Sequence, residues 1–246
     1  MRTANISRNA SLCLSVTLLS FLCLLSACAG GSASPVSTAS SNTSKSASPT
    51  FTQPILSLPD EGVAATIPVN PKPDIFVEGG SAEQLTFVGT DTKNISTNLY
   101  ALPYKKKGNR VDISFGQPLG QALEIQIPRE SNLTVTLTEG NVTVTTLQGP
   151  VDIHLTNGTI HLKDFTPSGT DTIQTESGTI DVTFAKNASC SLKAQTSFGT
   201  IISGYAAISG KRNGEADEAS GNIHDGSGAT VTLTVGSGSI TLGPVH

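Results

Sequence analysis

Short runs of alternating apolar and polar residues dominate the chain from Leu133 onward. In one run, Val151, Ile153 and Leu155 are separated by single polar residues. A strand with this pattern buries one face and exposes the other. Similar runs recur before and after a glycine throughout this half of the chain. The pattern therefore predicts pairs of short β-strands that meet at a glycine turn.

The glycines at these turns recur at a nearly constant interval. Six copies of a Gly–x–aliphatic triplet follow one another at spacings of 18, 20, 21, 22 and 17 residues: Gly140–Val142, Gly158–Ile160, Gly178–Ile180, Gly199–Ile201, Gly221–Ile223 and Gly238–Ile240. Such a period is typical of solenoids, in which each coil buries its apolar face against its neighbours. We predict an all-β fold, a β-solenoid that resembles a single-stranded β-helix with about six short coils.

A second architecture fits part of the same pattern. Asn157-Gly158 is a good two-residue hairpin signal, so an antiparallel β-meander or sandwich remains the alternative. Residues 58–128 also contain strand patterns but lack the glycine corner, and they predict an N-terminal β cap. The repeat domain then covers residues 129–246. Its fifth copy is preceded by the charged segment Lys211 to Ser220, which predicts a loop that caps or interrupts the stack.

The first 27 residues have the pattern of a lipoprotein signal peptide. The uncharged apolar run Ser11 to Ala27 is shorter than the ~20 residues that a spanning helix prefers. It ends in Leu25-Ser26-Ala27-Cys28, which resembles the lipobox of bacterial lipoproteins. The alternative is an ordinary secretory signal cut near the same place. We predict a protein that is exported and lipidated on Cys28. The lipid would anchor it to the outer face of the cell membrane, or to the outer membrane if the bacterium has two.

Composition narrows the class further. Residues 28–57 are rich in Ser, Thr and Pro and carry a single charge, Lys45, so we expect a flexible tether after the lipidated Cys. The whole chain holds 31 Thr and 24 Gly, which favours strands and excludes a helical bundle. A formal charge of −4 argues against a nucleic-acid partner, which would require a basic surface.

The sequence contains little that points to catalysis. Cys190 is the one cysteine outside the signal peptide and the lipobox, so we interpret it as a small buried residue. There is no G-x-S-x-G, phosphate-loop or H-E-x-x-H motif, and no evident pair of carboxyl groups suited to glycoside cleavage. We expect no catalytic residue, no metal and no cofactor.

Outward-facing polar residues of the repeats are candidate partner-binding positions. One strip contains His154, Gln174 and Gln195. If coils stack ~4.8 Å apart, His161 and Asp181 on another strip become neighbours that could pair. The same residues equally suit the solvated face that any solenoid has.

The charged segment is the second candidate. As a recognition loop it would act through Lys211, Arg212, Glu215, Asp217 and Glu218. Loops change without disturbing a repetitive scaffold, so they often carry specificity. The alternative is a neutral insertion at a tolerant turn.

The repeats resemble a known family. Ile127 to Val144, followed by LTNGTIHL, TESGTIDV, TSFGTIIS and LTVGSGSITL, is similar to the bacterial cell-envelope family of putative adhesins. This resemblance implies a β-helical surface domain and assigns no functional residues.

Three functions are compatible with these observations. The first is a non-enzymatic, lipid-anchored cell-surface protein that presents a β-solenoid for adhesion or for binding a protein or polysaccharide. The second is an accessory of envelope-stress signalling, because relatives of the family often occur beside signalling proteins. The third is a carbohydrate-active β-helix enzyme, which the missing carboxylate pair disfavours.

The lipid anchor is directly testable. The Cys28→Ser variant should lose lipid labelling and be released from membranes, because the thiol that carries the lipid is gone. Metabolic labelling and membrane fractionation measure both effects. A variant that stays membrane-bound with unchanged gel mobility would contradict the anchor.

Overall fold

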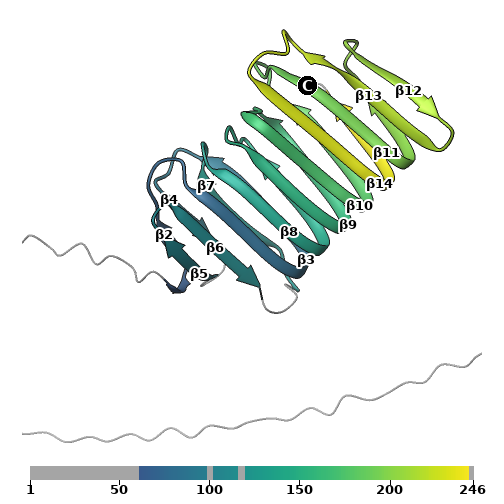
Figure 1. Cartoon of the computed structure of the whole chain (residues 1–246). Helices are drawn as coiled ribbons and strands as arrows, with labels where there is room; N and C mark the ends of the chain where they lie inside the picture. The colour runs from purple at the N-terminus through teal and green to yellow at the C-terminus, as the bar shows by residue number, and fades with distance from the viewer. Residues whose placement is uncertain (1–60, 99–101, 116–119, 244–246) are drawn as a thin grey trace, which may run out of the picture. The chain divides into compact units, whose positions relative to one another are not determined.

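The computed structural model of the protein describes residues 61–98, 102–115 and 120–243, which consist of β-strands and the turns between them (Figure 1). The predicted signal peptide, Cys28 and the tether lie outside these ranges. No helix in the described ranges has the length and apolar character needed to cross a membrane. The strands are β1 (Glu61–Ala64), β2 (Thr66–Pro68), β3 (Asp74–Thr90), β4 (Asn94–Thr97), β5 (Leu102–Lys107), β6 (Arg110–Phe115), β7 (Leu123–Pro128), β8 (Asn132–Thr145), β9 (Val151–Phe165), β10 (Gly169–Phe184), β11 (Cys190–Ser203), β12 (Ile208–Asn213), β13 (Ala216–Ile223) and β14 (Ala229–Gly243).

Six long strands form the body of the fold. They pair in parallel in the order β3-β8-β9-β10-β14-β11. Each bends near its middle, so that the residues before the corner form a first arm and those after it a second arm (Figure 1). A short connection then returns the chain to the start of the next coil. This parallel stack confirms the β-solenoid, and the antiparallel meander is not needed.

The coils do not stack in sequence order. The C-terminal strand β14 lies between β10 and β11, where Figure 1 shows its yellow ribbon among green ones. Gly238 is therefore in register with both Gly178 and Gly199. A stack in sequence order would place the third and fourth copies side by side, but residues 185–189 carry the chain past one coil position, which β14 fills.

The copy at Gly221 is not a coil. Strand β13 runs antiparallel to the first arm of β11 and places Gly221 beside Leu192, far from the corner. The expected loop Lys211 to Ser220 is instead most of a β-hairpin, in which β12 pairs with β13. Gly214-Glu215, with φ of 68° at the glycine, forms its two-residue tip, because Asn213 pairs with Ala216. A glycine at the first position of a two-residue turn is a hairpin signal that could have been found in the sequence.

Glycine is required at the corners because the coils approach one another there. In register, Ala82, Gly140, Gly158, Gly178, Gly238 and Gly199 form one column. A Cβ on Gly178 would lie 1.8 Å from the carbonyl oxygen of Gly158, and the other glycines of the column would make equally short contacts. The φ of Gly178 is also 146°, a value that residues with a side chain rarely adopt. The column begins with Ala82 of β3, which pairs with β6 before this corner and with β7 after it.

Both arms contribute inward-facing aliphatic residues to one core. The residues five before and two after the corner glycines are buried in β8, β9, β10 and β14, as the sequence predicts: Val135, Ile153, Ile173, Leu233, Val142, Ile160, Ile180 and Ile240. Aromatic rings fill the closing side of the coils. Phe184 lies 6.3 Å from Phe165 and 6.0 Å from Tyr205, centroid to centroid. Burying such a side chain contributes roughly 1.5–3 kcal/mol.

Each end of the stack is closed by short strands. At the N-terminal end, β6 and β7 pair with the two arms of β3, and β1, β2, β4 and β5 add antiparallel pairs, which form the cap. At the other end β13 covers only the first arm of β11. At the corner and the start of the second arm of β11, two further hydrogen bonds come from the hairpin. Asp217 Oδ2 accepts the Ile201 N–H at 3.0 Å, and the Glu215 carbonyl accepts the Gly199 N–H at 3.0 Å. These contacts occupy donors that an open strand edge would otherwise expose.

One acidic residue lies inside the core. Asp171 is an inward-facing, fully buried residue of β10. Its Oδ1 accepts the Val151 N–H at 2.8 Å, whereas Oδ2 is buried without a partner among the described residues. Burial raises the pKa of this carboxyl to about 7, although hydrogen bonds from Val151 and Ser168 oppose the rise. Burial, and then the nearby Asp171, raise the pKa of the Cys190 thiol to about 12. The interpretation of Cys190 as a small buried residue is confirmed.

The glycine column gives a sharp mutational test. Gly178→Ala should lower the free energy of unfolding by at least about 3 kcal/mol or prevent folding, because the new Cβ meets a neighbouring backbone carbonyl at an unfavourable φ. Gly80→Ala is the matched control, since a Cβ there meets nothing within 4 Å. The free energy of unfolding of this control should stay within about 1 kcal/mol of that of the parent. Urea denaturation measures both values, and equal losses would contradict the close approach.

Asp171 makes stability depend on pH. Its folded pKa of about 7 lies above the ordinary value of 3.8, so between these values the unfolded chain releases a proton that the folded chain keeps. The free energy of unfolding should therefore fall as pH rises from about 4 to about 7 and then level off. The loss would be at most about 4 kcal/mol for three pK units. Asp171→Asn keeps an acceptor for Val151 N–H and should remove this part of the slope. Urea denaturation from pH 4 to 8 measures it, and identical slopes in parent and variant would contradict the assignment.

Candidate binding face

A row of polar side chains crosses the outer face of the first arms. Strand register places Thr136, His154, Gln174, Thr234 and Gln195 side by side on β8, β9, β10, β14 and β11. The hairpin continues the row with Glu218 and Lys211, since Gln195 pairs with Glu218 and Glu218 with Lys211. We call these seven residues the outer row. Neighbouring positions are ~4.8 Å apart, the distance between paired strands.

The sequence predicted three members of this row. His154, Gln174 and Gln195 lie in one line, but Thr234 separates Gln174 from Gln195 because β14 is inserted there. All members are exposed or half-buried. None of the side chains of the outer row makes a hydrogen bond or ion pair to another residue in the described part of the chain. Their polar groups are therefore available to a partner.

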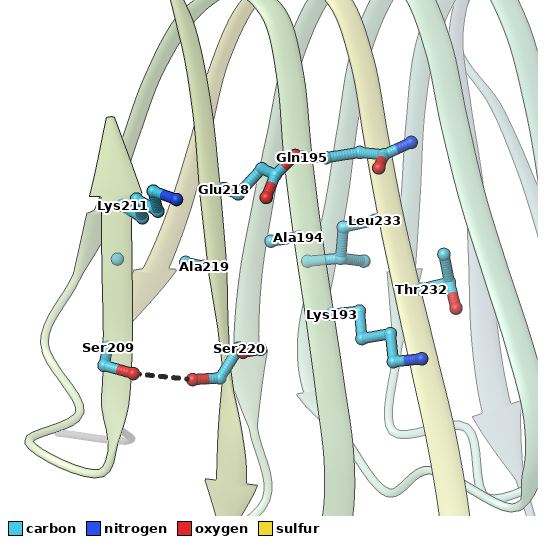
Figure 2. Close-up of a pocket in the computed structure, with 11 residues that line it drawn as sticks. Lys193, Ala194, Gln195, Ser209, Lys211, Glu218, Ala219, Ser220, Thr232 and Leu233 are labelled. Carbon is cyan, nitrogen blue, oxygen red and sulfur yellow. Dashed lines mark hydrogen bonds between the residues drawn. The ribbon is translucent and has the colours of Figure 1, made fainter. Parts of the chain in front are cut away.

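A groove of about 470 Å³ lies where the row reaches the hairpin (Figure 2). Four strands line it: β14, β11, β13 and β12. Its outward-facing polar residues are Lys193, Gln195, Ser209, Lys211, Glu218, Ser220 and Thr232. Ser209 Oγ donates to the Ser220 carbonyl at 3.4 Å. Figure 2 shows Lys211, Glu218 and Gln195 along one side of the groove and Ser209, Ser220 and Lys193 along the other. Lys193 was not predicted as a site residue. It lines the groove because the antiparallel pairing of β13 with β11 places Ser220 beside it.

A second hollow lies on the same face near the N-terminal end. Its volume is about 460 Å³, and Glu78, Ser114 and Thr136 are among the residues that line it. Register continues the outer row from Thr136 to Glu78 and Ser114. The Arg110 guanidinium covers the Phe76 ring at 3.5 Å and contacts Asp112 Oδ1 at 2.7 Å. The exposed face is thus a polar strip with a hollow at each end.

The five charged residues of the expected recognition loop have different positions in the hairpin. Lys211 and Glu218 line the groove. Arg212 Nε donates to the Gly214 carbonyl at 3.3 Å and so supports the tip. The Asp217 carboxylate and the Glu215 carbonyl cap the edge of β11. Two of the five are therefore placed to meet a partner and three hold the hairpin.

The predicted neighbours His161 and Asp181 lie on the second arms, away from the outer row. His161 Nδ1 is 3.0 Å from Asp181 Oδ2, so the expected pairing is confirmed. Thr143 and Thr241 flank this pair in the same line. His224 lies three residues after Gly221, as His161 does after Gly158, but it is not part of this line. It follows β13 and contacts the Ala188 carbonyl through Nδ1.

Strand β11 exposes two apolar side chains, one directly before its corner glycine and one on its second arm. Phe198 is 60% exposed and Ile202 is 61% exposed. The coils beside it carry Ser237 and Thr241, or Ser177 and Asp181, at these positions. This apolar spot adjoins the part of β11 that β13 does not cover.

No group of three or more His, Cys, Asp and Glu side chains that could hold a metal ion occurs within residues 61–98, 102–115 and 120–243. The outer row places one hydrogen-bonding group on each strand instead of gathering several at one point. Such spacing suits an extended partner that is bound by repeated contacts.

Comparison with known proteins supports the fold. Residues 123–243 match the family model described as Toastrack DUF4097. A solved structure of a putative cell adhesion protein from Clostridium sporogenes covers 76% of this chain and 100% of its own, with 14% identity and a TM-score of 0.54. A putative adhesin from Bacteroides fragilis covers 76% of this chain and 98% of its own, with 11% identity and a TM-score of 0.28. A search among curated proteins found no match.

The first of these structures shares the fold of this chain, and at such low identity it establishes nothing more. The family match covers five of the six bent strands, with β3 preceding it. It begins at Leu123, the first residue of β7, and ends at Gly243, the last residue of β14. The resemblance that the glycine repeats indicate is thereby confirmed for the repeat region: residues 123–243 form a Toastrack DUF4097 domain.

Proposed function

We propose that this protein is a non-enzymatic, lipid-anchored cell-surface protein that uses the outer row to bind a partner outside the cell. The observation that carries the proposal is the line of unengaged polar side chains across seven parallel and antiparallel strands. A rigid sheet holds these groups at a fixed spacing, so a partner binds without paying for loop ordering.

The anchor and the tether complete the proposal. A lipidated Cys28 would hold the chain on the membrane, and a flexible segment of about 30 residues would let the domain reach outward. A single lipid chain binds membranes weakly, whereas multiple acyl chains anchor a protein stably. The name of the Clostridium sporogenes protein agrees with a role in adhesion.

Weak contacts suffice for adhesion when many copies act together. Each hydrogen bond between the outer row and a partner contributes about 1 kcal/mol net. Several anchored copies on one cell would bind one polymer or one surface at the same time, and the combined affinity would far exceed that of a single copy.

A cell-attachment assay tests the proposal. A strain that produces the parent chain should attach to coated surfaces more strongly than a strain without it. The His154→Ala/Gln174→Ala/Gln195→Ala variant should lose this gain, because three positions of the outer row are removed. Cys28→Ser should also lose it, since the protein leaves the cell.

The second arm offers a matched control. Thr143→Ala/Thr241→Ala changes two outward residues on the second arms and should leave attachment unchanged. Equal attachment with and without the protein would refute the adhesive role and favour the accessory role in envelope-stress signalling.

A further inference from the structure

The outer row and its two hollows carry an inference about the partner's chemistry. Glu78 and Ser114 continue the seven-residue outer row at its N-terminal end, so that one side chain lies on each of nine neighbouring strands, from Ser114 to Lys211. Eight steps of ~4.8 Å give a length of roughly 38 Å. A partner that uses the whole row must therefore be long and must run across the strands.

Protein partners fit this surface poorly. Energetic hot spots of protein interfaces are enriched in Trp, Tyr and Arg and lie in desolvated pockets, and none of these residue types occurs in the outer row. A peptide strand that extends the sheet would bind at an edge through backbone groups, not across a face through side chains.

The central part of the row also carries no formal charge. Between Glu78 at one end and Glu218 at the other, its residues are Thr136, His154, Gln174, Thr234 and Gln195. Hydroxyl and amide groups both donate and accept hydrogen bonds, as do the hydroxyl groups of sugars. The interstrand repeat is close to the length of one hexose in an extended β-linked chain, so successive sugars could meet successive side chains.

The groove at the hairpin would bind the end of such a chain. Glu218 presents a carboxylate that can accept two neighbouring hydroxyl groups, and Lys211 and Lys193 present donors nearby. Neither lysine forms an ion pair within the described part of the chain, and the side chain of Glu218 forms none there either. The groove thus offers one acceptor group and two donor groups on three adjacent strands, β11, β13 and β12.

We infer that the partner is a neutral, β-linked polysaccharide whose chain lies along the outer row, with one segment in the groove lined by Gln195, Glu218 and Lys211. This inference rests on the proposed function and specifies its ligand. Phe198, directly before the corner of β11, and Ile202, on its second arm, take no part in it.

Binding of defined oligosaccharides tests the inference. The exported full chain with Cys28→Ser provides soluble protein, and NMR titration or calorimetry measures affinity for cellohexaose, hexa-N-acetylchitohexaose, hexagalacturonate and cellobiose. A neutral hexasaccharide should bind about tenfold or more tightly than the disaccharide, since it contacts more of the row. It should also bind more tightly than hexagalacturonate.

Variants locate the site. Gln195→Ala/Glu218→Gln should weaken hexasaccharide binding by about tenfold or more, because contacts in the groove are lost. Thr241→Ala, on the outer face of the second arms, is the control and should bind like the parent. Circular dichroism and thermal melting verify that both variants fold.

Three results would overturn the inference: no binding of either neutral hexasaccharide, preference for hexagalacturonate, or affinity unaffected by the groove variant. The proposed function has a separate test. Attachment that depends on the outer row, together with absent oligosaccharide binding, would leave a surface-binding role intact and exclude the neutral polysaccharide. Loss of the attachment phenotype itself would refute the proposed function.

Discussion

The close approach of backbones at the corner column is the constraint on which the whole structure depends. Each coil after β3 bends where a glycine lies against the backbone carbonyl of the neighbouring coil. A Cβ on that glycine would come within about 2 Å of the carbonyl oxygen. This contact sets the register of five coil junctions at once. Because side chains alternate along a strand, a shift by one residue would turn every aliphatic residue outward. The corner glycines therefore decide which face is core and which face is free to bind.

The C-terminal strand β14 is inserted within the stack of coils, between β10 and β11. β10 and β11 are consecutive in sequence, yet each forms its long parallel pairing with β14. In a solenoid that stacks in sequence order, loss of the terminal coil exposes one new face. Here the loss of β14 would open the stack between β10 and β11, since Gly178 and Gly199 would both lose their contact with Gly238. The C-terminal strand is thus a central element, and it also supplies Thr234 to the outer row.

The hairpin has two roles that use different side chains. Asp217 and the Glu215 carbonyl cover backbone donors of β11, which limits strand addition at this edge. Lys211 and Glu218 extend the outer row by two positions and create the groove. The same sixteen residues, Ile208–Ile223, therefore both close the stack and contribute to the lining of the groove.

Much of this architecture follows from the sequence alone. Alternation such as Val151, Ile153 and Leu155 determines the strands and their buried face, and Gly158 and Gly178 determine the corners. The contact between His161 and Asp181 follows as well, because β9 and β10 stack in sequence order. These features are local or involve consecutive copies, so they can be derived from spacing and stereochemistry.

The tertiary structure decided the rest. The copies present the same glycine and aliphatic pattern, so the sequence does not reveal which copy lies beside which, and β14 could be placed only by the complete stack. Asp171 resembles a turn residue in sequence, but the register with Val231 places it in the core. The groove depends on the antiparallel pairing of β13 with β11, which brings Glu218 beside Gln195 and Lys193 beside Ser220. Long-range pairing, not local propensity, selects these neighbours, because several pairings satisfy the same alternating pattern.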